Sequence, residues 1–190
     1  MSILADWQIR KLCLNAPAPM ISPYAPHQVR EEQGKKIISW GESAFGYDVR
    51  LDDEFKIFTN INSVVIDPLD FNQNCCVDHK GPYCIIPPNS YILGKTIETF
   101  DIPRDVMVVC LGKSTYARTG AIVNVTPIEA GFRGKVVIEI SNSTSLPLKV
   151  YAGMGISQFL FFRGETGCSV SYADRQGKYQ GQDTVQTALL

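Results

Sequence analysis

The stretch Lys135-Val-Val-Ile-Glu-Ile-Ser141 alternates β-branched apolar residues with other side chains. Successive side chains of a β-strand point to opposite faces of its sheet. One face then carries Val136, Ile138 and Ile140, and the other carries Lys135, Val137, Glu139 and Ser141. This period of two predicts a strand that packs one face on an apolar core.

Strand-length segments of similar character lie on both sides of this stretch, with Pro and Gly between them as turn signals. We expect strands at Ile37–Trp40, Tyr47–Leu51, Phe55–Phe58, Val64–Ile66, Cys84–Ile86, Tyr91–Thr99, Val106–Leu111, Ala121–Val125, Leu148–Tyr151, Gly155–Phe162 and Ser169–Tyr172. Many short strands separated by turns are typical of an all-β barrel or a double-sheet jelly roll. A parallel α/β sheet would need helices between the strands, and the pattern does not provide them.

The two ends of the chain differ from this pattern. Residues 2–14 place apolar side chains at helical spacing, which predicts one amphipathic helix that opens at Ser2. Residues 173–190 are polar and rich in Gly and Gln, so we expect a tail that folds over another part of the protein. With no linker between them, we read residues 1–190 as a single domain.

Composition limits the classes of function. Eighteen Lys and Arg against nineteen Asp and Glu give a net charge of −1, which does not favour a nucleic-acid polymer as partner. No segment approaches the ~20 apolar residues of a membrane-spanning helix, and the N-terminal residues do not form a secretion signal. We therefore expect a cytoplasmic protein, away from membranes, whose six cysteines stay reduced.

Glu139 is the first candidate for chemistry, because it lies between apolar neighbours in the alternating stretch. If its face is buried, loss of solvation raises the pKa of the carboxyl and lets it give and take protons near neutral pH. If its face is wet, Glu139 is an ordinary surface acid.

The segment Leu111-Gly-Lys-Ser-Thr-Tyr-Ala-Arg-Thr-Gly120 is the second candidate. Lys113, Ser114 and Thr115 offer an ammonium group, two hydroxyls and backbone N–H groups at a turn, an arrangement that suits a phosphate. The spacing is not that of a nucleotide P-loop, so an ordinary polar turn remains the alternative. Phe45-Gly-Tyr-Asp-Val-Arg50 and the lone amide of Gln158 are weaker signals.

Taken in order, these pieces resemble the deoxycytidine triphosphate (dCTP) deaminase family of the dUTPase superfamily. The motifs that carry the resemblance are Phe45-Gly-Tyr-Asp48, Gly112-Lys-Ser-Thr-Tyr-Ala-Arg118, Val125-Thr-Pro-Ile-Glu-Ala-Gly-Phe-Arg-Gly134, Val137-Ile-Glu-Ile-Ser-Asn142 and Lys178-Tyr-Gln-Gly-Gln182. The resemblance implies a mostly β, dUTPase-like distorted jelly roll or β-barrel with an N-terminal helix, assembled as a homotrimer. It also implies deamination of dCTP to dUTP and ammonia, which supplies dUTP for thymidylate synthesis.

The resemblance assigns roles to individual residues. Glu139 would move the protons, while Ser114 and Arg118 would hold the water and orient the acid. The substrate-binding set that it implies is Lys113, Ser114, Thr115, Tyr116, Ala117, Arg118, Val137, Ile138, Glu139, Gln158, Tyr172, Lys178 and Gln182. Within this set the first three would hold the triphosphate, and the last three would come from a tail that closes over the nucleotide. Sites between subunits are expected.

Metal chemistry is expected to be limited to Mg²⁺ that accompanies the triphosphate. Zinc-dependent deaminases carry H-x-E and P-C-x-x-C patterns. Neither His27 nor His79 is followed by x-Glu, and the sequence has no C-x-x-C. We therefore predict a zinc-independent reaction with no cofactor for the chemistry and no metal ligand in the protein.

One departure keeps other functions open. Many relatives carry Ile-Asp-Pro-Gly-Trp or Ile-Asp-Pro-Gly-Phe where this chain has Ile128-Glu-Ala-Gly-Phe132. Because the corresponding Asp of dUTPases holds the attacking water, Glu129 bears on whether dUTP is also hydrolysed. The alternatives are a dUTP pyrophosphatase, a bifunctional deaminase and dUTPase, or a non-catalytic nucleotide-binding regulator. Inhibition by dTTP, as in some relatives, is a further possibility.

Overall fold

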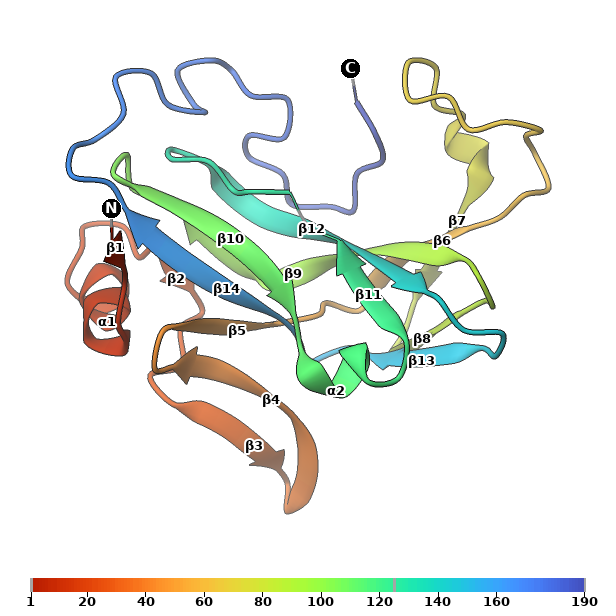
Figure 1. Ribbon diagram of the computed structural model, residues 1–190, viewed down its shortest axis with the longest axis horizontal. Coiled ribbons are helices and arrows are strands. Elements are labelled where there is room, and N and C mark those ends of the chain that lie inside the picture. Colours follow the sequence, from red (N-terminus) through yellow and green to blue (C-terminus); the bar gives the residue numbers. More distant parts are fainter. Residues whose placement is uncertain (1, 125, 190) are drawn as a thin grey trace.

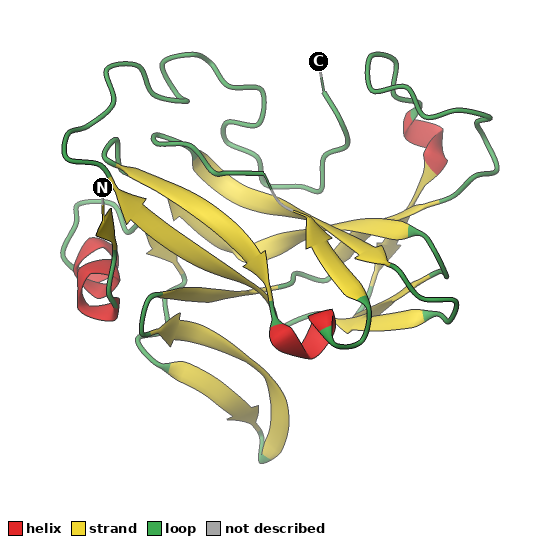
Figure 2. Ribbon diagram, in the orientation of Figure 1, coloured by secondary structure: helices red, strands yellow, loops and turns green. Residues whose placement is uncertain are grey.

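Antiparallel strands form most of the protein in a computed structural model, which describes residues 2–124 and 126–189 (Figures 1 and 2). The first sheet has the order β1-β14-β5-β4-β3, and β10 also pairs with β14. Its strands are β1 (Ser2–Ile3), β3 (Gln28–Glu32), β4 (Lys35–Ser43), β5 (Gly46–Arg50), β10 (Val106–Gly112) and β14 (Gly155–Arg163).

The second sheet has the order β11-β12-β9-β6-β7, and β2 also pairs with β9. Its strands are β2 (Ile21–Ser22), β6 (Glu54–Phe58), β7 (Cys76–Lys80), β9 (Tyr91–Asp101), β11 (Ala121–Asn124) and β12 (Arg133–Asn142). A separate two-stranded antiparallel sheet joins β8 (Tyr83–Ile86) to β13 (Leu148–Tyr151). The helical elements are α1 (Asp6–Leu14), the 3₁₀ helix η1 (Gln73–Cys75) and α2 (Ser114–Ala117).

The apolar core lies between the two larger sheets. Phe159 of β14 contacts Phe100 of β9 with ring centroids 5.2 Å apart, and both side chains are fully buried. Ile138 and Ile140 of β12 are also fully buried, whereas Glu139 between them is not. The predicted alternation of β12 is therefore confirmed, and it turns Glu139 away from the core.

A buried ion pair links the two sheets. Arg50 at the end of β5 donates from Nε to Glu98 of β9 over 2.8 Å, and the Glu98 side chain is fully buried. The guanidinium also lies 3.9 Å from the ring centroid of Trp40. Because a buried charge is retained only where it is paired and hydrogen-bonded, this contact fixes β5 against β9.

Several predicted boundaries differ from the structure. Helix α1 begins at Asp6 and not at Ser2, because Ser2 and Ile3 pair with β14 instead. Residues 64–66 lie in an exposed loop and residues 169–172 in a turn region, so both predicted strands are wrong. Strands β3 and β7 were missed because their sequences are largely polar. Val125, the last residue of one predicted strand, lies outside the described residues.

The tail follows the edge of the second sheet. Gly181 N donates to Arg133 O over 2.8 Å, and Lys135 N donates to Gln182 O over 2.8 Å, so the tail continues the pairing of β12. In Figure 1 this blue segment runs alongside β12 towards the C-terminus. The tail thereby covers the face of the sheet that carries Glu139.

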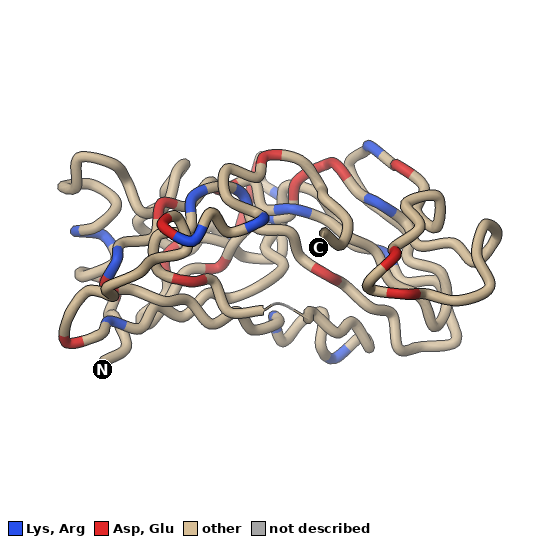
Figure 3. The backbone as a smooth tube through the Cα atoms, turned by 90° about the horizontal axis from the view of Figure 1, so that it is seen from above, with Lys and Arg blue, Asp and Glu red and all other residues tan. Residues whose placement is uncertain are grey.

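Charged residues of both signs are mixed along the chain (Figure 3), and the cysteines that the structure describes are not paired with one another. Basic and acidic residues are interspersed along the tube in Figure 3, in keeping with the net charge of −1. All six cysteines lie in the described part of the chain and are free thiols. None of the helices in residues 2–124 and 126–189 has the length and apolar character that crossing a bilayer requires.

Candidate active site

A cavity of about 860 Å³, here called the main cavity, lies between the second sheet and the tail. Strand β9 contributes Tyr91 and Leu93 to its wall, and β12 contributes Val137 and Glu139. Most of the remaining wall comes from the segment 126–132 and from tail residues between 172 and 188, and Phe71 and Val136 complete it. The tail therefore closes one side of the cavity.

Glu139 is one of the two carboxyl groups that the described part of the chain places on this wall. It pairs with Leu93 of β9 on one side and with Asn124 of β11 on the other, so its position is fixed by two neighbouring strands. Burial raises the pKa of the Glu139 carboxyl to about 7, and a hydrogen bond to its own backbone offsets only part of that effect. A carboxyl group with this pKa exchanges protons in both directions near neutral pH.

Aromatic rings form much of the remaining wall. Phe132 and Tyr172 meet edge to face with centroids 5.8 Å apart, and Tyr91 stacks on Phe58 at 4.9 Å. Tyr179 of the tail lines the same cavity. Such rings provide flat apolar faces for a planar ligand. Sequence reasoning missed Tyr91 and Leu93, because only the pairing of β9 with β12 brings them beside Glu139.

The three predicted tail residues lie on the main cavity and are held by contacts of their own. Tyr172 OH accepts from Tyr179 N over 3.0 Å. Lys178 Nζ donates to Leu189 O over 2.5 Å, and Gln182 Nε2 donates to Lys135 O over 2.9 Å. The structure thus brings Tyr172, Lys178 and Gln182 together with Val137 and Glu139.

The predicted phosphate-binding segment does not line the main cavity of the single chain. Ser114, Thr115, Ala117 and Arg118 are exposed on and after the short helix α2. Among the described residues, Glu139 has no hydrogen bond or ion pair with Ser114 or Arg118.

Two members of that segment have structural contacts. Lys113 Nζ donates to Asp48 Oδ2 over 2.6 Å, and both side chains are largely buried. Tyr116 is buried, and its hydroxyl accepts from Tyr151 N over 3.2 Å. These contacts anchor α2 to the rest of the domain and leave the hydroxyls of its first turn at the surface.

Two further predicted residues lie elsewhere. Ile138 is fully buried on the core face of β12. Gln158 of β14 donates from Nε2 to Ser43 Oγ over 3.0 Å in the first sheet, so it does not line the main cavity of this chain. Neither side chain can reach a ligand in the main cavity from this position.

Glu129 lies on the wall of the main cavity, where it pairs with Arg175 of the tail. Both side chains are about half exposed. Within the described residues, no group of three His, Cys, Asp or Glu side chains is arranged to hold a metal ion.

An antiparallel β domain with a carboxyl group of raised pKa on the wall of an aromatic cavity suits an enzyme that transfers protons on a small planar substrate. The chain belongs to the dCTP deaminase-like family, whose sequence model matches residues 3–164. The prediction of this family is confirmed.

Individual relatives agree with this assignment. The chain is 56% identical over 185 residues to a protein of Acidovorax sp. named dCTP deaminase, with 97% of each chain covered. It is 57% identical over 186 residues to the dCTP deaminase of Paraburkholderia phymatum, again with 97% of each covered. Because both alignments cover almost the whole chain, the relationship extends beyond residue 164 into the tail.

A solved structure supports the fold. The 2′-deoxycytidine 5′-triphosphate deaminase from Agrobacterium tumefaciens aligns with a TM-score of 0.59 and 19% identity. The match covers 85% of this chain and 48% of that chain. The prediction of a mostly β fold with an N-terminal helix is confirmed by the strands and by α1.

Proposed function

We propose that this protein deaminates dCTP to dUTP and ammonia, with Glu139 as the group that moves protons. The observation that carries the proposal is the Glu139 carboxyl on the wall of the main cavity, where burial raises its pKa to about 7. Relatives named dCTP deaminase that are 56% and 57% identical over nearly the full chain support the choice of substrate.

The reaction balances as dCTP plus water giving dUTP plus ammonia. The Glu139 carboxylate takes a proton from water as the oxygen attacks C4 of the cytosine ring, and the same proton passes to the ring nitrogen N3. The carboxylate then takes the proton of the new C4 hydroxyl and gives it to the amino group. The C4–N bond breaks, ammonia leaves, and the C4 carbonyl forms. A positioned acid–base group of this kind contributes roughly 10²–10⁴-fold in rate. Hydrogen bonds to the intermediate must supply the rest.

The exposed turn Ser114–Arg118 belongs to the same proposal through a second subunit. In a homotrimer, this turn of one chain would face the main cavity of its neighbour, and Ser114 and Arg118 would then hold the water and orient Glu139. Gln158 would reach the base and sugar only in such a shared site. Exposure of the hydroxyls and the guanidinium in the single chain supports this arrangement.

A mixing experiment tests the shared site. We expect Glu139→Gln and Ser114→Ala homo-oligomers each to be nearly inactive, and mixed oligomers formed by co-expression to recover activity, because some interfaces then combine two unchanged residues. Light scattering of the wild type should give three times 21.1 kDa. Inactive mixed trimers, or an active monomer, would contradict the shared site.

Mg²⁺ is proposed to arrive with the triphosphate and to neutralise part of its charge. The two carboxylates on the cavity wall are not free to form a protein cage for the ion, since Glu129 is paired with Arg175 and Glu139 is needed for proton transfer. dTTP shares the deoxyribose and triphosphate, so the same cavity is proposed to accept it as an inhibitor. Free thiols fit a reducing, cytoplasmic location.

The decisive test is Glu139→Gln, with Glu129→Gln as the matched control on the same wall. We expect Glu139→Gln to bind dCTP with a Kd close to that of the wild type and to release ammonia at least ~10²-fold more slowly. Glu129→Gln should keep most of the deaminase activity. An unchanged rate in Glu139→Gln would leave a non-catalytic regulator, or another catalytic group, as the better explanation.

Hydrolysis of dUTP is the second candidate, favoured by the place of Glu129 on the cavity wall. Its carboxylate is already paired with Arg175, so it is less available to hold an attacking water. Incubation with dUTP alone should therefore give little pyrophosphate. Pyrophosphate from dUTP that is lost in Glu129→Gln would establish a bifunctional enzyme, and pyrophosphate with no ammonia from dCTP would establish a pyrophosphatase.

A further inference from the structure

Strand β9 carries an almost buried lysine close to the main cavity. Lys95 is 4% exposed and pairs in register with Val137 of β12. Two residues away on the same strand, Leu93 pairs with Glu139. Residues two apart on a strand share a face. Lys95 therefore lies on the face that carries Glu139, although it does not line the main cavity.

The Lys95 ammonium contacts both the sheet and the tail. It forms an ion pair with Glu54 of β6, and Asp52 Oδ2 lies 3.7 Å away. It also donates to the backbone oxygen of Asp183 over 2.9 Å. The sheet thus neutralises the charge, and one N–H of the ammonium is directed to the tail.

The contact falls next to a proposed substrate-binding residue. Gln182 precedes Asp183, and its backbone and side chain both bond to Lys135 of β12, over 2.8 and 2.9 Å. Lys135 Nζ in turn donates to Asp52 Oδ2 over 3.1 Å, so the two lysines share a carboxylate. Lys135 Nζ also lies 3.7 Å from Asp183 Oδ1. Lys95 and Lys135 together therefore hold the tail at Gln182 and Asp183.

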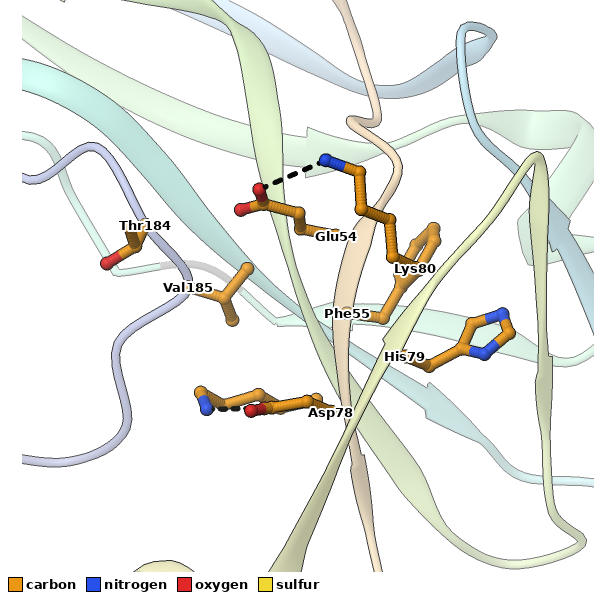
Figure 4. Close-up of a pocket in the computed structure, with 8 residues that line it drawn as sticks. Glu54, Phe55, Asp78, His79, Lys80, Thr184 and Val185 are labelled. Carbon is orange, nitrogen blue, oxygen red and sulfur yellow. Dashed lines mark hydrogen bonds and ion pairs between the residues drawn. The ribbon is translucent and has the colours of Figure 1, made fainter.

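Beyond this point the tail makes further contacts of its own: Val185 and Thr187 are buried, and Leu189 N donates to Tyr179 OH over 3.2 Å. Thr184 and Val185 line a second cavity of about 350 Å³, the side cavity, whose opposite wall is formed by β6 and β7. Figure 4 shows these two tail residues across the cavity from Glu54, Phe55 and Asp78, with the Glu54–Lys80 ion pair between the strands. Lys95 therefore contacts the tail at Asp183, between Gln182, which lines the main cavity, and Thr184, which lines the side cavity.

We propose that Lys95 is a positioning residue, which holds the tail on the sheet and so places Gln182 and closes the main cavity. The inference rests on the proposed function of the main cavity and extends it to a residue outside that cavity. An ammonium that is almost fully buried cannot exchange its tail contact for water without moving. Loss of the Lys95 ammonium therefore loosens the tail. Glu139 keeps its place, because β12 stays paired with β9 and β11.

The test is Lys95→Met, with Lys95→Arg as the conservative variant. A hydrogen bond from a charged group to a neutral acceptor is worth enough to change affinity by roughly 10-fold or more when it is lost. We expect Lys95→Met to raise the KM for dCTP by that factor and to leave kcat within about threefold, since Glu139 is not touched. Lys95→Arg keeps the charge and a donor and should restore most of the affinity.

A double variant guards against a simple folding defect. Lys95→Met alone leaves Glu54 with only its longer, 3.6 Å contact to Lys80, whereas Lys95→Met/Glu54→Gln removes both charges. The double variant should show the same rise in KM. A KM that stays within twofold of the wild type in both variants would overturn the proposal, and so would a fall in kcat with unchanged KM.

Limited proteolysis provides a readout that does not depend on dCTP turnover. Trypsin cleavage after Arg175 or Lys178 should be at least fivefold faster in Lys95→Met than in the wild type, and Lys95→Arg should resist cleavage. Equal cleavage rates in Lys95→Met and the wild type would overturn the positioning role of Lys95, even if dCTP is not the substrate. A wild type that releases no ammonia would instead reject the proposed function, while the proteolysis result would still decide the role of Lys95.

Discussion

Lys113 Nζ lies 2.6 Å from Asp48 Oδ2, and the two side chains are only 12% and 9% exposed. The same carboxylate oxygen accepts from Gln28 Nε2 over 3.1 Å. The pair ties the start of α2 to β5 in the first sheet. A lysine that the sequence places at a phosphate-binding turn therefore has a fixed partner within its own chain.

Asp48→Asn should destabilise the protein, because it leaves the Lys113 ammonium almost buried without a counter-ion. Breaking a buried pair in this way costs about 3–5 kcal/mol of unfolding free energy. Urea denaturation measures the loss, and Lys113→Met/Asp48→Asn should recover most of it. A loss below about 1 kcal/mol would show that solvent screens the pair as at an exposed site.

The pKa of Glu139 predicts how stability depends on pH. Burial raises the pKa of this carboxyl from 4.5 to about 7 in the folded protein, so the unfolded chain loses its proton first as pH rises. The wild type should therefore lose stability relative to Glu139→Gln between pH 4.5 and about 7, with a constant difference above that range. Denaturation at a series of pH values measures this. A difference that shrinks as pH rises would contradict the burial of Glu139.

The same pKa predicts a pH dependence of the reaction. The carboxylate form of Glu139 must take a proton from water, so kcat/KM for dCTP should rise with pH through an apparent pKa near about 7. Because the triphosphate also titrates, the Kd of dCTP for Glu139→Gln should be measured over the same range as the control. A wild-type profile that is flat between pH 5.5 and 8, after this correction, would argue against Glu139 as the base.

Chelators should separate the two roles of metal ions. EDTA is expected to raise the KM for dCTP, because the triphosphate loses its Mg²⁺, and added Mg²⁺ should restore it. A zinc-selective chelator at concentrations that spare Mg²⁺ should leave kcat unchanged. Activity that is lost to this chelator and returns only with Zn²⁺ would show that the proton-transfer mechanism proposed for Glu139 is incomplete.

The sequence predicts the parts of the fold and site that local pattern determines. Alternation in β12 correctly identified the core face and the opposite face of Glu139. A similar apolar run predicted a strand at Val64 and Val65, and this prediction is wrong, because both side chains are exposed in a loop. A local pattern cannot show whether a partner strand exists. Tyr91 came beside Glu139 only through a pairing between distant segments, which no local signal encodes.

Long-range contacts also explain why the predicted site is only partly assembled in one chain. Lys113 is held by Asp48, a partner 65 residues earlier, and Gln158 is held by Ser43, 115 residues earlier. The residue types of Lys113 and Gln158 suggested that both could bind a nucleotide. Residue type alone cannot show whether a side chain already has a hydrogen-bond partner in its own chain. Tyr172, Lys178 and Gln182, by contrast, lie on the main cavity, and their role in substrate binding stays a prediction.

The free thiols have a practical meaning for handling the protein. Only the thiolate form of cysteine reacts readily with oxygen-derived oxidants and with other disulfides. Burial raises the pKa of Cys13 to about 12 and that of Cys84 to about 11, so these two are almost entirely protonated at the pH of ordinary buffers. Burial also raises the pKa of Cys76. Because oxidants reach accessible thiols first, air oxidation should begin at the half-buried Cys168, and a purified sample should keep its interior thiols unmodified for longer.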